Sequence, residues 1–177
     1  MKADFSNFRT HLDTALAKIL WLYFETPVAG ADVEEEVVRE RLFCYELYHQ
    51  LRCACDEASF PYWIGGELDK MKHPIIRSNV KPDLVIHEPG YMTSNLCVIE
   101  VKPVSGDAAG FQKDIRTLTN FVTKEAYHAG ILLVYGHCDG AEGKIRQKIQ
   151  TDVSKLRALN IFVLWIENAQ AKLIELK

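Results

Sequence analysis

Residues 81–103 read KPDLVIHEPGYMTSNLCVIEVKP, and they contain two apolar runs separated by a polar turn. Leu84-Val85-Ile86 predicts one β-strand, because short apolar runs rich in β-branched residues are typical of buried strands. Residues 96–101 predict the next strand, which ends before Pro103. Glu88-Pro89-Gly90 breaks the first run and supplies a turn. We therefore expect these two consecutive strands to pair in the antiparallel direction.

Three charged residues lie at the ends of these two strands. Asp83 opens the first strand, and Glu100 and Lys102 close the second. Antiparallel pairing brings the start of one strand beside the end of the next, so Asp83 and Glu100 should be neighbours. Glu100 and Lys102 are two residues apart, so both should point to the same face of the sheet.

Two carboxylates held close together are unfavourable unless a cation neutralises them. Hard oxygen ligands of this kind suit Mg²⁺ or Mn²⁺, which keep several waters and complete their shell with substrate phosphate. The backbone carbonyl of Val101 offers one more oxygen. The pattern therefore predicts metal-assisted hydrolysis, in which Asp83 and Glu100 hold the ion and Lys102 positions or deprotonates the attacking water.

The tripeptide Glu-x-Lys has no value on its own, because it occurs at three places, 100–102, 142–144 and 175–177. Glu142 lies at an expected helix start, where a solvated carboxylate is favoured. Glu175 lies in an expected terminal edge strand with no acidic partner before it. Only Glu100 lies at the end of an expected buried strand with another strand just before it in the chain. That earlier strand opens with Pro82-Asp83. Context, rather than spacing, selects Glu100 and Lys102.

The other segments predict an α/β protein with a central mixed β-sheet flanked by helices. Apolar residues at helical spacing predict helices over 3–24, 32–55, 111–122 and 141–159. Thr26-Pro27 would end the first helix, and Asp32 is the expected N-cap of the second. Further strands are expected at 62–64, 131–135, 161–166 and 172–176, with a bulge or bend at Gly65-Gly66.

The chain has 177 residues, which fits one domain spanning 1–177. The formal net charge of −3 gives no general attraction to nucleic acid, so such a surface would have to be local. One clustered basic segment precedes Asp83, and Lys113 is a further candidate for contacting phosphate. A solvated loop or helix face is the alternative for these residues. The basic segment contains Lys70, Lys72, His73, Arg77 and Lys81.

The cysteines and the apolar runs indicate where the chain would reside. None of the five cysteines belongs to a C-x-x-C pair, which favours a reducing compartment over disulfides or structural zinc. No apolar run approaches the length that spans a bilayer, and the first residues lack a signal-peptide pattern. We therefore expect a cytoplasmic protein without a membrane partner.

Pro82-Asp83, followed after sixteen residues by Glu100-Val101-Lys102, resembles the PD-(D/E)xK nuclease superfamily. Its members share a restriction-endonuclease-like core of order α-β-β-β-α-β, and the elements expected over residues 40–136 are similar in that order. The first helix and a C-terminal α-β-β would then be additions. The stretches YELYHQLR at 45–52 and GGELDK at 65–70 are also similar to small uncharacterised bacterial members.

This resemblance implies Mg²⁺ or Mn²⁺ as the cofactor and nucleic acid as the partner, with DNA favoured over RNA. It also implies an acidic metal ligand on the first core helix, and Glu46 resembles that position. Restriction-like nucleases often pair to cut two strands, so a homodimer is a further expectation that rests on the resemblance alone.

Each of these residues has a plainer alternative. Asp83 can order the start of a strand after proline, and Glu100 with Lys102 can form a surface ion pair. Glu46 can be a solvated helical residue, in which case Glu67, after two glycines, is the alternative acidic ligand. The alternative function is a catalytically silent module of the nuclease fold that binds protein or nucleic acid. The intact Asp, Glu and Lys favour catalysis, whereas the acidic net charge favours the module.

Overall fold

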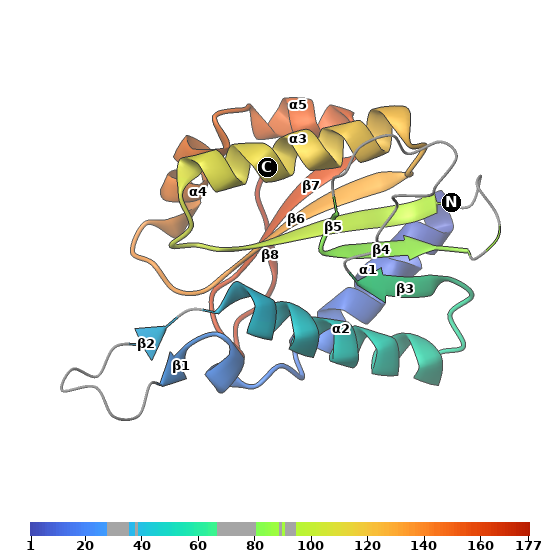
Figure 1. Ribbon diagram of the computed structural model, residues 1–177, viewed down its shortest axis with the longest axis horizontal. Helices are drawn as coiled ribbons and strands as arrows, with labels where there is room; N and C mark the ends of the chain where they lie inside the picture. Colours follow the sequence, from blue (N-terminus) through green and yellow to red (C-terminus); the bar gives the residue numbers. More distant parts are fainter. Residues whose placement is uncertain (28–35, 38, 67–80, 89, 91–94) are drawn as a thin grey trace.

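The structure is a computed structural model that describes residues 1–27, 36–37, 39–66, 81–88, 90 and 95–177. In this part of the chain, a six-stranded mixed sheet lies between two layers of helices (Figure 1). The strands lie across the sheet in chain order. They are β3 (Trp63–Gly66), β4 (Leu84–His87), β5 (Asn95–Pro103), β6 (Ala129–Tyr135), β7 (Ile161–Ile166) and β8 (Ile174–Glu175).

The two halves of the sheet are built differently. Strands β3, β4 and β5 form an antiparallel meander, whereas β5–β6 and β6–β7 are parallel pairs. Strand β8 adds antiparallel to β7. Parallel neighbours need a crossover connection, and α3 (Ala108–Lys124) provides the first. The second consists of α4 (Ala141–Ile149) and α5 (Val153–Ala158). The prediction of a mixed sheet with helices on both faces is confirmed.

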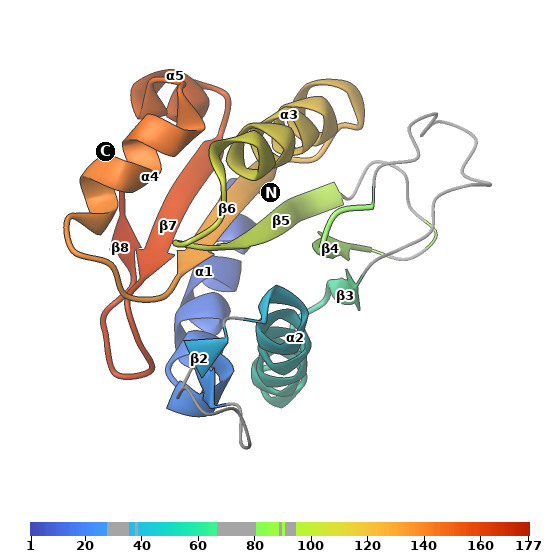
Figure 2. The same cartoon turned by 60° about the vertical axis from the view of Figure 1, so that its left-hand side comes forward.

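The helices form one apolar core on each face of the sheet (Figure 2). Helices α1 (Lys2–Leu16) and α2 (Glu40–Glu57) cover one face, where Phe43 stacks on Tyr135 of β6 with ring centroids 3.9 Å apart. Helices α3, α4 and α5 cover the other. In β5, Ile99 belongs to the first core and Val98 to the second, as the alternation of side chains along a strand requires. None of the helices in the described residues is long and apolar enough to cross a bilayer.

The first and the last of the predicted helices are shorter than expected. Helix α1 ends at Leu16, and a 3₁₀-helix, η1 (Trp21–Tyr23), follows where the first helix was expected to continue to residue 24. The buried residues of this segment, Ile19 and Phe24, are five positions apart, so a regular helix would place them on different faces. The helix expected over 141–159 is interrupted at Gln150, whose φ of 56° is left-handed. Helices α4 and α5 are therefore separate.

Helix α2 begins at Glu40, whereas the sequence pattern predicted a start at Asp32. Asp32 lies outside the described residues, but β2 (Glu36–Val37) pairs with β1 (Thr26–Pro27), so the chain is extended just before the helix. Glu40 is thus the acidic residue of the first turn. The bulge expected at the glycines is also absent, because β3 pairs regularly with β4 through Gly66. The irregularity lies instead in the pairing of β4 with β5.

Candidate active site

Asp83 and Glu100 lie beside each other where β4 begins. The β4–β5 register pairs Leu84 with Ile99, so one further step places Asp83 opposite Glu100. Oδ2 of Asp83 accepts a 2.7 Å hydrogen bond from the backbone N–H of Val101. The Val101 N–H lies beyond the last residue pair of β4 and β5, so no β4 carbonyl pairs with it. The Asp83 carboxylate accepts its hydrogen bond instead, and this contact fixes the carboxylate in position.

Lys102 connects the end of β5 to a helix on each face of the sheet. Its Nζ lies 2.9 Å from Oε2 of Glu40 on α2 and 3.2 Å from Oδ2 of Asp114 on α3. The contact with Glu40 is a hydrogen bond. The contact with Asp114 is an ion pair in which the Lys102 ammonium faces the buried Oδ2. Asp114 is only 3% exposed, so α3 presents a buried carboxylate to the site, with Lys102 as its partner.

The turn between β5 and α3 is packed around the stem of Lys102. A Cβ atom added at Gly106 would lie 3.0 Å from the Pro103 carbonyl oxygen and 3.1 Å from Cδ of Lys102. Gly110 also lies close to this stem, because a Cβ added at Gly110 would be 3.9 Å from Cε of Lys102. Asp107 caps α3 by accepting a 2.6 Å hydrogen bond from the Gly110 N–H. This packing restricts the positions that the ammonium group can reach.

Burial raises the pKa of the carboxyl groups at this point. Glu100 is 5% exposed, and burial, followed by the nearby Asp83 and Asp114 carboxylates, raises its pKa far above the usual range. Burial also raises the pKa of Asp83, to which the charges of Glu40 and Asp114 add. Asp114 itself has a raised pKa, chiefly through burial, although Lys102 opposes the rise. Four carboxyl groups, those of Glu40, Asp83, Glu100 and Asp114, lie near three basic groups, those of Lys102, Lys113 and Arg41, so a proton or a further cation would complete the neutralisation of the cluster.

Glu46, predicted from the sequence as a metal ligand, lies away from this cluster. It accepts a 2.7 Å hydrogen bond from Nε2 of Gln50, one turn later on α2. Glu40 and Glu46 are six residues apart, which is about 240° around an α-helix, so the two cannot face the same point. Glu40, which the sequence analysis did not single out, is the acidic residue of α2 that contacts Lys102.

The predicted basic residues are only partly described. Lys113 is exposed on α3, and its charge opposes the rise in the pKa of Glu100 that burial causes, so it lies near the cluster. Lys81 is exposed two residues before Asp83. The rest of the basic segment and the alternative acidic ligand lie outside the described residues, namely Lys70, Lys72, His73, Arg77 and Glu67.

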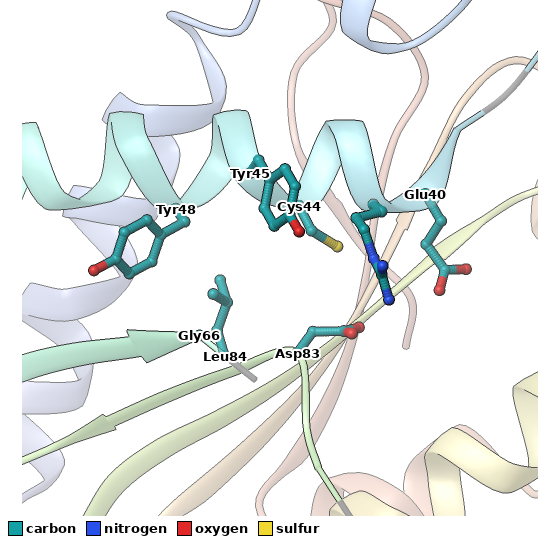
Figure 3. A pocket seen from close by; sticks show the side chains of 8 residues that line it. Glu40, Cys44, Tyr45, Tyr48, Gly66, Asp83 and Leu84 are labelled. Atoms are coloured by element: carbon teal, nitrogen blue, oxygen red, sulfur yellow. The ribbon is translucent and has the colours of Figure 1, made fainter. Parts of the chain in front are cut away.

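A pocket of about 450 Å³ opens beside Asp83, between α2 on one side and the end of β3 with the start of β4 on the other (Figure 3). Glu40, Cys44 and Tyr48 follow one another at intervals of four, so a single stripe of α2 faces the pocket. Burial, followed by the charges of Asp83 and Glu40, raises the pKa of the Cys44 thiol, which keeps it protonated. The complete lining is Glu40, Arg41, Cys44, Tyr45, Tyr48, Gly66, Asp83 and Leu84.

The oxygen atoms of the cluster suit a hard cation. In the described part of the chain, no three His, Cys, Asp or Glu side chains are grouped so as to hold a metal ion. Mg²⁺, however, is commonly held by one or two carboxylates, with waters and substrate phosphate completing the shell. The adjacent Asp83 and Glu100 provide such a pair. Oδ2 of Asp114 is already paired with Lys102, so Asp114 adds negative charge next to this pair.

Comparison of the chain with protein-family models, with curated proteins and with solved structures gave no match. The function is therefore argued from the geometry and chemistry of Asp83, Glu100, Lys102 and the residues around them.

Proposed function

We propose that this protein is a divalent-metal-dependent hydrolase of phosphodiester bonds, with DNA favoured over RNA as the substrate. The observation that carries the proposal is the placement of two adjacent carboxylates, the half-buried Asp83 before β4 and the buried Glu100 of β5, near Lys102 at the end of β5. Burial and the neighbouring charges make the ionised forms of these two carboxyl groups unfavourable, and a bound cation would offset this cost. Phosphodiester hydrolysis uses such a cation beside the phosphate.

The order of elements supports membership of the PD-(D/E)xK superfamily. Helix α2, strands β3, β4 and β5, helix α3 and strand β6 follow one another as α-β-β-β-α-β over residues 40–135. In this proposal these elements are the restriction-endonuclease-like core. Helix α1 precedes it, and α4, α5, β7 and β8 follow it as additions.

In the proposed mechanism, Asp83 and Glu100 would hold Mg²⁺ or Mn²⁺, and the carbonyl of Val101 would offer a further oxygen. An ion bound there supplies a Lewis acid beside the scissile phosphate and makes a nearby water more acidic. The hydrogen bond from the Val101 N–H keeps the Asp83 carboxylate in one orientation, so the pair does not have to reorganise when substrate binds.

Lys102 acts as a charged donor rather than as a base in this mechanism. Burial lowers its pKa, but the hydrogen bond and charge of Glu40 and the charge of Asp114 outweigh burial, and the net shift is upward. A lysine with a raised pKa stays protonated at neutral pH. It can therefore orient the attacking water or stabilise the developing charge on the phosphate, and Glu40 and Asp114 are positioning residues.

A second candidate function is a catalytically silent module of the same fold that binds protein or nucleic acid. The observation that favours it is the pairing of Lys102 with two carboxylates from different helices. This network would hold the two helical layers together whether or not the site is catalytic.

A cleavage assay on single-stranded, duplex and branched DNA, with Mg²⁺ or Mn²⁺, separates the two candidates. The wild type should cut at least one of these DNAs, and Glu100→Gln and Lys102→Met should each reduce the rate by about 100-fold or more. Lys18→Met is the matched control, because Lys18 forms an exposed ion pair with Glu57 in which the two atoms are 3.7 Å apart. If the wild type cuts none of these DNAs with either metal, the catalytic proposal fails and the silent module is favoured.

A further inference from the structure

The pocket beside Asp83 has walls that suit a flat aromatic ligand. Tyr45 is 60% exposed and Tyr48 is half-buried, and both rings project from α2 toward the strands (Figure 3). Across from them lie Leu84 and Gly66. A Cβ added at Gly66 would be 3.9 Å from Cδ2 of Tyr48 and 3.8 Å from Cδ2 of Leu84. A Cβ at Gly66 would therefore be in ordinary van der Waals contact with both side chains, and glycine keeps this wall of the pocket lower by the size of one methyl group.

This pocket is continuous with the carboxylate cluster. Asp83 and Glu40 line the pocket, and both also belong to the group of charges around Lys102. A phosphate placed beside Asp83 would therefore put its own sugar and base next to Tyr45 and Tyr48. The volume of about 450 Å³ lies in the usual range for small ligands, roughly 300–1,000 Å³, and fits one nucleotide rather than a duplex.

We propose that this pocket binds one unpaired nucleobase, stacked on Tyr45 or Tyr48, next to the phosphate that the cluster hydrolyses. The choice of ligand rests on the proposed function. A base inside a duplex has both faces covered and must leave the helix before it can enter such a pocket. The substrate class is therefore DNA with an unpaired nucleotide at the point of cleavage, such as a single strand, a flap or a frayed end.

The charge balance of the chain agrees with this assignment. Affinity for duplex DNA comes largely from contacts of lysine and arginine with phosphates. The chain has a net charge of −3, and its pocket sets one arginine, Arg41, against two carboxylates, Glu40 and Asp83, so the pocket itself adds no net positive charge to that attraction. Stacking of bases on aromatic rings is an independent source of affinity that does not depend on net charge.

Photochemical cross-linking tests where the base lies. A short single-stranded DNA with one 5-iodouracil is irradiated with the Glu100→Gln variant, which limits turnover, and the adduct is located by mass spectrometry. The adduct should form on Tyr45 or Tyr48, and the same base within a duplex should give at least about 10-fold less product. Adducts only at other residues, or equal yields from the single strand and the duplex, would overturn the proposal.

Binding measured by fluorescence anisotropy tests what the pocket contributes. In the same Glu100→Gln background, Tyr45→Ala combined with Tyr48→Ala should weaken binding of the single strand by about 10-fold or more, whereas Tyr45→Phe should retain it. Gly66→Leu, which fills the space beside Tyr48, should also weaken binding. Trp21→Ala is the matched control, because Trp21 is 58% exposed but does not line the pocket. Unchanged binding by the double tyrosine variant, or equal binding of an abasic strand, would overturn the proposal.

The two proposals can fail separately. A strand that cross-links to Tyr45 or Tyr48 and is never cut by the wild type supports the pocket assignment and contradicts the hydrolase. Equal cutting of duplex and single strand, unaffected by the tyrosine substitutions, overturns the pocket assignment and keeps the hydrolase.

Discussion

The ammonium group of Lys102 lies between a carboxylate of α2 and a carboxylate of α3, 2.9 Å from Oε2 of Glu40 and 3.2 Å from Oδ2 of Asp114. The two helices cover opposite faces of the sheet, so this one side chain joins both layers at the end of β5. The same contacts hold the lysine charged beside Asp83 and Glu100. Stability and the proposed chemistry therefore depend on the same residue, and the predictions below separate the two roles.

Lys102→Met should lower the free energy of unfolding by about 3 kcal/mol, because removing one partner of a buried ion pair leaves the other charges uncompensated. Lys102 is 15% exposed and Asp114 is 4% exposed at the side chain. Urea denaturation followed by tryptophan fluorescence measures the change. Lys18→Met should cost less than about 1 kcal/mol, because that pair with Glu57 is exposed. Equal losses in the two variants would contradict the structural role of Lys102.

Asp83→Ala should be less stable than Asp83→Asn by about 1–3 kcal/mol. Both substitutions remove the negative charge beside Glu100, so that effect cancels in the comparison. Asparagine keeps an oxygen that can accept from the Val101 N–H, whereas alanine leaves this N–H without an acceptor. Chemical denaturation of the two variants under the same conditions gives the difference. Identical stabilities would show that the hydrogen bond to Val101 does not contribute.

The metal-free protein should become less stable as the pH rises from about 4 through neutrality. Burial gives Glu100 and Asp83 raised pKa values, so the folded state binds more protons than the unfolded state, and stability falls with increasing pH. In EDTA, the melting temperature should therefore be lower near about pH 8 than near about pH 6, and Mg²⁺ should reduce the difference. Glu100→Gln should flatten the dependence. A wild-type melting temperature that rises over this interval in EDTA would contradict the assignment.

Glu40→Gln should reduce the rate of DNA cleavage by about 10- to 100-fold, which is the effect expected when a partner that orients a catalytic group is lost. Glu46→Gln should change the rate by less than about 2-fold, because Glu46 is bonded to Gln50 and does not reach Lys102. The two variants differ only in their position on one helix, so each controls for the other. A large loss in Glu46→Gln with none in Glu40→Gln would restore the original sequence prediction.

The local pattern of the chain was sufficient to predict the centre of the site. The apolar runs around residues 84–86 and 96–101, separated by a turn, predict antiparallel pairing, and the pairing alone brings Asp83 beside Glu100. The mixed sheet and its two helical layers follow from the same alternation of strand and helix patterns. The signals for these features are local, because each strand, turn and helix has its own pattern in a short stretch of the chain.

The remaining members of the cluster depend on contacts between distant segments. Glu40 was missed because the acidic run before it resembled the first turn of a longer helix, whereas residues 36–37 are extended and the helix begins at Glu40. The spacing of Glu40, Cys44 and Tyr48 marks the stripe that faces the pocket, and it was a usable signal. Asp114 gave no such signal, because its burial results from the packing of α3 against the end of β5.

Titration calorimetry with Mn²⁺ tests the central claim most directly, because it measures the metal site without requiring the correct substrate. The wild type should bind Mn²⁺ with release of protons, since the buried Asp83–Glu100 pair must lose protons to bind a cation. Asp83→Asn, which keeps the hydrogen bond to Val101, should bind at least about 10-fold more weakly. Absence of Mn²⁺ binding by the wild type, or equal affinity in the variant, would contradict the account.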